Sequence, residues 1–164
     1  MRKIIALLMV LLSFAACGSN VKDKENGLEN RAFRSKAEMI WQDKIYNCEI
    51  ERVDSSSLKM TVKGENLQIP ICFDISQGGF KMTQGELELS VPFNEAQPQS
   101  AAAELYRTFM LLGQAEGEKT GDIITYKISS SVLRYDKKSD EITMVETQNG
   151  KITFKDFSFL PEQR

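Results

Sequence analysis

The chain has 164 residues, of which 41% are hydrophobic and 27% are charged, with 21 Lys and Arg against 23 Asp and Glu. This balance argues against a nucleic-acid-binding groove and against a basic surface that docks on membranes. Histidine is absent, which removes the most common general base and metal ligand. The length and hydrophobic content predict one globular domain with a real core.

The N-terminal segment has the pattern of a bacterial lipoprotein signal peptide. Two basic residues are followed by an apolar segment over 4–12, which is too short for the roughly 20 residues of a membrane-spanning helix. Ala15 and Ala16 then stand before Cys17. In lipoprotein signals a cysteine at this place is acylated and becomes the new N-terminus, so we predict a lipid anchor on Cys17.

Two alternatives stay open, because Phe14 stands where lipoprotein signals usually have leucine. They are an ordinary secretory signal with a chance cysteine, and a retained membrane anchor. Two or three acyl chains, palmitate among them, anchor a protein stably where one chain does not. We expect a signal peptide over 1–16, a lipidated flexible tether over 17–28 and a single domain over 29–164. The expected location is the extracytoplasmic face of the cell membrane.

The domain begins with apolar residues at helical spacing. Within the segment 29–44, Phe33, Ala37, Ile40 and Trp41 stand at offsets 0, 4, 7 and 8, which place them on one face of a helix. Charged residues fill the other face. We therefore predict a first helix here.

The pattern then changes to the alternation of β-strands. Short turn-like links separate the alternating segments, which predict about five antiparallel strands with one apolar face. These segments are KIYNCEIERV, SLKMTVK, NLQIPICFDI, GFKMT and ELELSVP.

Two cysteines fall in this region. Cys48 alternates with apolar residues, whereas Cys72 shares its face with Gln68 and Asp74. One strand separates them, so they are about 9.6 Å apart, beyond the roughly 7 Å that a disulfide spans. We expect two free thiols.

A second helix is predicted in PQSAAAELYRTFMLL, residues 98–112. Ser100 is a good N-cap, the three alanines favour a helix, and Leu105, Phe109 and Leu112 share one face. The segment GQAEGEKTG then predicts a loop, and DIITYKIS, VLRYDKK, EITMVET and KITFKDFSF predict four strands. Asn149-Gly150 between the last two is a hairpin signal.

No set of residues indicates catalysis. Carboxylates are scattered, the serines at 129–131 have no histidine to activate them, and Gly78-Gly79 lacks the context of a phosphate loop. We expect no enzymatic activity, no metal and no other cofactor.

The predicted fold class is α+β: a curved antiparallel sheet of about nine strands, forming an incomplete half-barrel, with two helices on its concave apolar face. This order of elements, with the motifs NLQIPICFDISQGGFKMTQGELELSVP and GKITFKDFSF, resembles the LolA/LolB-type lipoprotein-carrier fold. It is similar in particular to small lipidated proteins of Gram-positive bacteria. The resemblance covers about residues 29–160. It implies an open half-barrel whose concave face accommodates acyl chains, and no catalytic residues.

The expected function is therefore binding of an apolar ligand, a lipid or an acyl chain, by a membrane-anchored monomer with no nucleic-acid partner. The candidate wall residues are Trp41, Phe73, Leu105, Phe109, Leu112, Tyr126 and Phe154. Burial in an ordinary core is the competing interpretation of each. One alternative is a cell-surface module with a cystatin- or NTF2-like sheet and a filled core, binding a protein or glycan by its loops. Another is a structural or inhibitory envelope protein with no small ligand.

Overall fold

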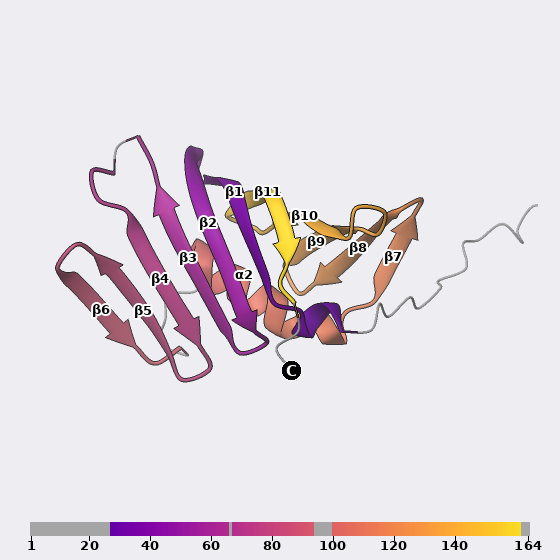
Figure 1. The fold of residues 1–164 in the computed structure, drawn as a ribbon, viewed down its shortest axis with the longest axis horizontal. Coiled ribbons are helices and arrows are strands. Elements are labelled where there is room, and N and C mark those ends of the chain that lie inside the picture. The colour runs from indigo at the N-terminus through magenta and orange to yellow at the C-terminus, as the bar shows by residue number, and fades with distance from the viewer. Residues whose placement is uncertain (1–26, 66, 94–99, 162–164) are drawn as a thin grey trace, which may run out of the picture.

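The computed structural model describes residues 27–65, 67–93 and 100–161 (Figure 1). They form one antiparallel sheet of eleven strands, one α-helix and two short 3-10 helices. The strands are β1 (Phe33–Trp41), β2 (Lys44–Asp54), β3 (Ser57–Lys63), β4 (Ile71–Ser76), β5 (Gly79–Gln84), β6 (Leu87–Val91), β7 (Gly117–Thr120), β8 (Ile123–Ile128), β9 (Ser131–Asp136), β10 (Glu141–Glu146) and β11 (Gly150–Phe159). The helical elements are η1 (Leu28–Asn30), α2 (Ala101–Leu111) and η3 (Leu112–Gln114).

The sheet consists of two meanders joined at its centre. Its strand order is β6-β5-β4-β3-β2-β1-β11-β10-β9-β8-β7. Every pair of neighbouring strands except one is therefore also consecutive in the chain. The exception is the pairing of β1 with β11, which aligns Phe33 with Phe159 and Trp41 with Gly150. The sheet does not close, and β6 and β7 are its edges.

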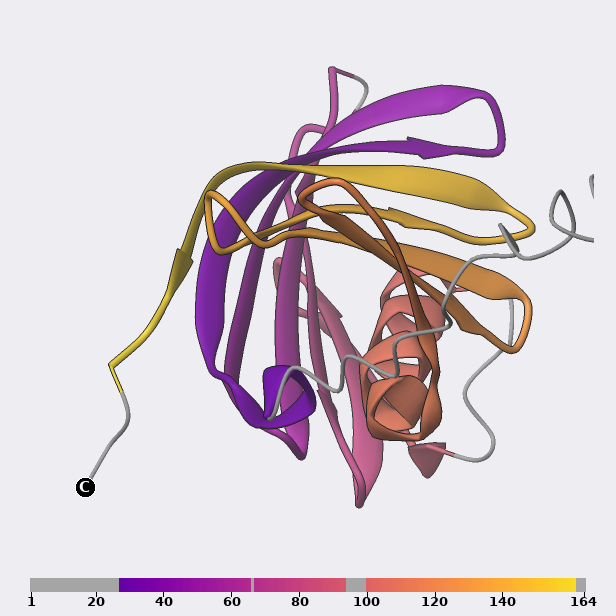
Figure 2. The same cartoon turned by 90° about the vertical axis from the view of Figure 1, so that its right-hand side faces the viewer.

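The helix α2 lies on the concave side of the sheet, which bends around it (Figure 2). Leu105, Phe109 and Leu112 are buried, as their shared face predicts. Ser100 takes the N-cap position, where its carbonyl accepts a 2.9 Å hydrogen bond from the amide of Glu104. The predicted helix is therefore confirmed, and it connects one sheet edge to the other.

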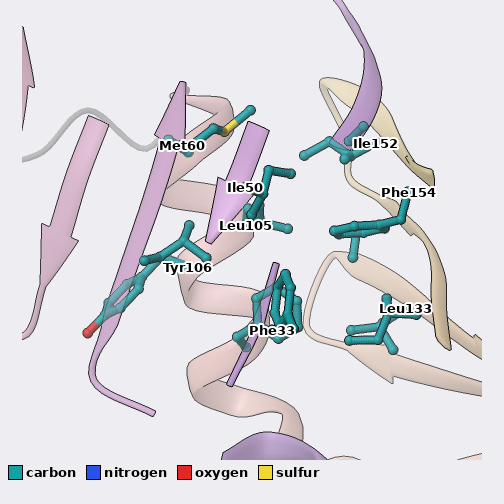
Figure 3. Packing of buried hydrophobic residues seen from close by; sticks show 14 of the residues in the cluster. Phe33, Ile50, Met60, Leu105, Tyr106, Leu133, Ile152 and Phe154 are labelled. Atoms are coloured by element: carbon teal, nitrogen blue, oxygen red, sulfur yellow. The ribbon is translucent and has the colours of Figure 1, made fainter. Parts of the chain in front are cut away.

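An aromatic cluster fills the centre of the core (Figure 3). Phe33 of β1 is fully buried. Its ring centroid lies 5.2 Å from that of Phe109 on α2, and 6.1 Å and 5.0 Å from those of Phe154 and Phe157 on β11. Phe33 therefore joins the two meanders to the helix.

A β-bulge in β11 lets both of its core phenylalanines face inward. Phe154 and Phe157 are three residues apart, so regular alternation would place them on opposite faces. The register with β1 shifts between Arg34 and Lys36, and Asp156 takes a positive φ of 50°. One extra residue on a strand changes its phase in this way. The hydroxyl of Ser35 donates a 2.8 Å hydrogen bond to the carbonyl of Lys155 and so satisfies a polar group at the bulge.

The predicted helix over residues 29–44 is wrong, because Phe33–Trp41 form β1. Phe33, Ala37 and Trp41 are spaced by four, which fits a strand face as well as a helix face. Ile40, which only the helical spacing placed with them, is 41% exposed. The segment pairs with β2 on one side and with β11 on the other. These pairings satisfy its backbone hydrogen-bonding groups and favour a strand over a helix.

The fold class is thus confirmed as an open antiparallel sheet and corrected in its composition. The described part of the chain is mostly β, with eleven strands instead of about nine and a single long helical segment instead of two. One additional strand is β1. The other is β7, which lies within the predicted loop GQAEGEKTG and pairs with β8. Gly117 and Glu118 are not residues that favour a strand, so β7 is recognised only by its pairing with β8.

Cys48 and Cys72, the two cysteines of the described residues, are free thiols. Cys48 on β2 is buried and Cys72 on β4 is exposed, and β3 separates them. The prediction that they form no disulfide is therefore confirmed.

The described structure begins near the end of the expected tether. Leu28, the last residue of that tether, begins η1 and is buried. Residues 1–26, with the expected signal peptide and Cys17, lie outside the described residues.

Replacing Phe33 with alanine should destabilise the protein strongly. The change removes ring contacts to three phenylalanines and leaves a cavity at the centre of the core, which typically costs about 3–5 kcal/mol. Ile45→Ala is the matched control, because Ile45 is 66% exposed and surface changes stay within about 0.5 kcal/mol. Urea unfolding measures both. Equal effects of the two changes would contradict this account of the core.

The two thiols should differ sharply in reactivity. Burial raises the pKa of Cys48 to about 12, so almost none of it is the reactive thiolate at pH 8. In a Cys17→Ser chain, a thiol reagent should label Cys72 rapidly and Cys48 only after unfolding. Counting modified thiols with and without guanidinium checks this. Rapid labelling of both in the native protein would show that the β2 face is open.

Candidate functional site: an apolar cavity at the start of the helix

The concave face of β1–β6 contains a cavity of about 610 Å³ that opens to solvent. Its walls come from β1–β6, from the segment before β4 and from the N-cap and first residue of α2. The lining residues are Met39, Trp41, Tyr46, Val62, Leu67, Ile71, Phe73, Phe80, Met82, Leu89, Val91, Ser100 and Ala101.

Strand alternation places these side chains on the same wall. Phe73, Met82 and Leu89 stand directly opposite one another on β4, β5 and β6. Residues paired in this way in an antiparallel sheet point to the same face. Phe80 packs beside Phe73, with ring centroids 5.8 Å apart. The meander thus forms a continuous apolar surface from β3 to the edge strand.

The cavity exists because the helix is shorter than the sheet. The helical segment has 11 residues in α2 and 3 in η3, which at ~1.5 Å per residue span about 21 Å. Eleven strands spaced ~4.8 Å apart extend over about 48 Å of curved sheet. One helix therefore cannot cover the whole concave face. The uncovered part lies beyond Ser100 and Ala101, at the start of α2.

The side chains of the cavity wall are mostly apolar. Among the lining residues, polar groups come from the Ser100 hydroxyl, the Tyr46 hydroxyl and the Trp41 indole nitrogen, and no Asp, Glu, Lys or Arg takes part. Such a surface favours an apolar ligand, since a charged group would lose its hydration without gaining a partner. A few polar groups can still orient a ligand.

The seven candidate residues divide between this cavity and the core. Trp41 and Phe73 lie on the cavity wall. The other five are buried in the core: Leu105, Phe109, Leu112, Tyr126 and Phe154. The sequence pattern therefore identified the apolar face but not the part of it that the helix leaves uncovered. Alternation on β3–β6 was the signal for the missed wall residues of those strands, such as Met82 and Leu89.

A buried arginine lies at the other end of the helix. Arg52 is on β2, and its guanidinium lies 5.0 Å from the ring centroid of Phe109. Its Nη2 donates hydrogen bonds to the carbonyls of Glu29 and Ser55, while Nη1 has no hydrogen-bond partner among the described residues. Burial lowers its pKa to about 10. The Tyr106 hydroxyl of α2 donates a 3.0 Å hydrogen bond to the carbonyl of Ser56, the residue after Ser55.

Arg52 therefore helps to pack the end of the core opposite the cavity. Arg52 continues the alternation of Cys48 and Ile50 along β2, which puts it on the apolar face, but this pattern alone does not show that the charge is buried. A guanidinium on a ring face gains a cation–π interaction, which offsets part of the cost of burial.

No group of three His, Cys, Asp or Glu within residues 27–65, 67–93 and 100–161 is placed to hold a metal ion. None of the helices in the described part of the chain is long and apolar enough to cross a membrane. Ser129 and Ser130 form the turn between β8 and β9, where Ser129 has a positive φ of 53°, and Ser131 is the first residue of β9.

Comparison with models of known protein families gives no match to this chain, and comparison with curated proteins also gives none.

Proposed function

We propose that this chain is a membrane-anchored lipoprotein that binds the acyl chain of a lipid or of an acylated molecule in the cavity of the β1–β6 half. The observation that carries the proposal is the cavity itself. Its volume of about 610 Å³ falls within the 300–1,000 Å³ that is usual for small-molecule sites. Its wall is mostly apolar and belongs to a preformed sheet. Ligand binding would therefore cost little conformational entropy in the wall.

The energetics of the cavity suit a hydrocarbon chain. Each methylene removed from water contributes about 0.8 kcal/mol, so ten buried methylenes contribute about 8 kcal/mol before the costs of association. Trp41 and Tyr46 are amphipathic side chains on the wall, which suits contact with both a chain and its polar end. The described residues that line the cavity include no Asp, Glu, Lys or Arg, and we propose binding without enzymatic turnover.

The anchor is part of the proposal and rests on the sequence around Cys17. Acylation there would hold the domain at the extracytoplasmic face of the membrane, where acyl chains are abundant. The open sheet with α2 on its concave side supports the LolA/LolB-type resemblance, because that fold implies an apolar concave face which accommodates acyl chains.

The competing function is a surface interaction module with a filled core. The β7–β11 half fits that description, since Tyr126, Leu133 and Phe154 are buried there. The β1–β6 half does not, because its concave face has a cavity. We therefore favour the apolar ligand.

A ligand should accompany the protein through gentle purification. Native mass spectrometry of the chain, before and after organic extraction, should reveal a bound mass of a few hundred daltons that extraction removes. Trp41 is the sole tryptophan and lies on the cavity wall, so adding fatty acid to the extracted protein should change its fluorescence. An apo mass together with unchanged fluorescence would reject acyl binding.

Filling the cavity should abolish binding. In Met82→Trp a larger side chain enters the wall, and we expect affinity for a fluorescent fatty-acid probe to fall at least about tenfold, roughly 1.4 kcal/mol. Lys81→Trp is the matched control: it adds the same ring one residue away, on the opposite face of β5. Equal losses in both variants would place the binding site elsewhere.

A further inference from the structure

We propose that β6 pairs with β6 of a second copy of this chain, antiparallel and around a two-fold axis at Leu89. The inference does not rest on the acyl ligand, because it uses the sheet edge and not the content of the cavity. It replaces the expectation of a monomer, which rested on sequence alone.

β6 has a free edge with an apolar side. It pairs with β5, and no described strand lies on its other side. Leu87 is 73% and Leu89 49% exposed. Unpaired edges of this kind recruit further strands unless charge or shape prevents it. The other edge strand, β7, has the sequence GEKT and offers no apolar side chain to bury.

The hairpin before β6 determines which backbone groups face outward. Its turn has two central residues, Gly85 with a φ of 59° and Glu86, and Gln84 and Leu87 flank it as partners. In such a turn the flanking residues exchange the hydrogen bonds of the ladder. Alternation then directs the N–H and C=O groups of Leu87, Leu89 and Val91 toward β5. Those of Glu88 and Ser90 point to the open side.

The sequence of β6 is complementary to itself in one register. With the axis at Leu89, Leu87 lies opposite Val91 of the second copy, and Glu88 lies opposite Ser90. The outward backbone groups of Glu88 and Ser90 then face each other and form the ladder. Within one chain the Ser90 hydroxyl donates a long 3.4 Å hydrogen bond to Oε1 of Glu88, and Lys81 holds Oε2 of the same carboxylate at 2.8 Å. In the dimer the Ser90 hydroxyl would donate to the Glu88 carboxylate of the second copy instead.

Shifted registers lack this complementarity. An axis at Glu88 would place two carboxylates directly opposite each other, which is destabilising. An axis at Ser90 would pair Glu88 with Pro92, which has no N–H for the ladder. In the Leu89 register both concave faces lie on the same side of one continuous sheet. Leu87 and Leu89 of each copy then extend the β6 wall of the other copy's cavity.

Disulfide trapping tests the register directly. In the full chain with Cys17→Ser and Cys72→Ser, Leu89→Cys places two cysteines on the axis, where Cα atoms of a pair that does not share hydrogen bonds are about 4.5 Å apart. That separation is within the range of disulfides, ~4.4–6.8 Å. Mild oxidation should convert most of the Leu89→Cys chain to a covalent dimer on a non-reducing gel.

The matched control is Leu87→Cys in the same background. Its two copies would lie four residues apart along the strands, at least about 13 Å, so the dimer yield should be at least tenfold lower. Mixing differently tagged Leu87→Cys and Val91→Cys chains should restore cross-linking between the tags. Equal yields for Leu87→Cys and Leu89→Cys, or no dimer from any of them, would overturn the proposal. Unchanged melting curves confirm that these edge variants fold.

Discussion

The pairing of β1 with β11 is the interaction on which the rest of the structure depends. It joins residues more than a hundred positions apart, and without it the two meanders would be separate sheets. Phe33 lies at this junction and contacts aromatic rings from β11 and α2. The bulge at Asp156 belongs to the same junction, because it turns Phe157 back toward the core. Bringing residues so far apart in the chain together costs conformational entropy. Burial of the aromatic cluster must offset that cost.

The second constraint is how much of the concave face of the sheet the helical segment can cover. A curved sheet of eleven strands has one concave face, and a single helical segment must cover it. The helix begins after one edge strand and ends before the other, so its length determines which part of that face stays open. Around Phe109 and Leu105 the interior is filled, whereas beyond Ser100 the wall of Phe73, Met82 and Leu89 remains accessible. The proposed ligand site and the proposed pairing edge both lie in the part that the helix does not reach.

Local sequence patterns predicted much of this fold, and they failed where two interpretations fit equally. The strands from Lys44 to Val91, the helix after Ser100 and the final hairpin followed from alternation, capping and Asn149-Gly150. The segment Phe33–Trp41 did not, since spacing by four satisfies both helix and strand, and pairing on both sides selected the strand. In the site, the apolar face was predictable but its uncovered part was not. Trp41 and Phe73 lie on the wall, while Phe109 and Phe154 lie in the core.

Along the regularly alternating strands β2–β6, the sequence by itself determined which side chains share a face. Alternation along β2 and β4 places Cys48 on the apolar face and Cys72 on the polar face, in agreement with the burial of the first and the exposure of the second. Only the tertiary structure decided that β1 is a strand, that Arg52 is buried and that a cavity lies beside Ser100. The physical reason is range. Alternation is set by neighbours in the chain, whereas pairing, coverage and cavity volume depend on elements that meet only when the chain folds.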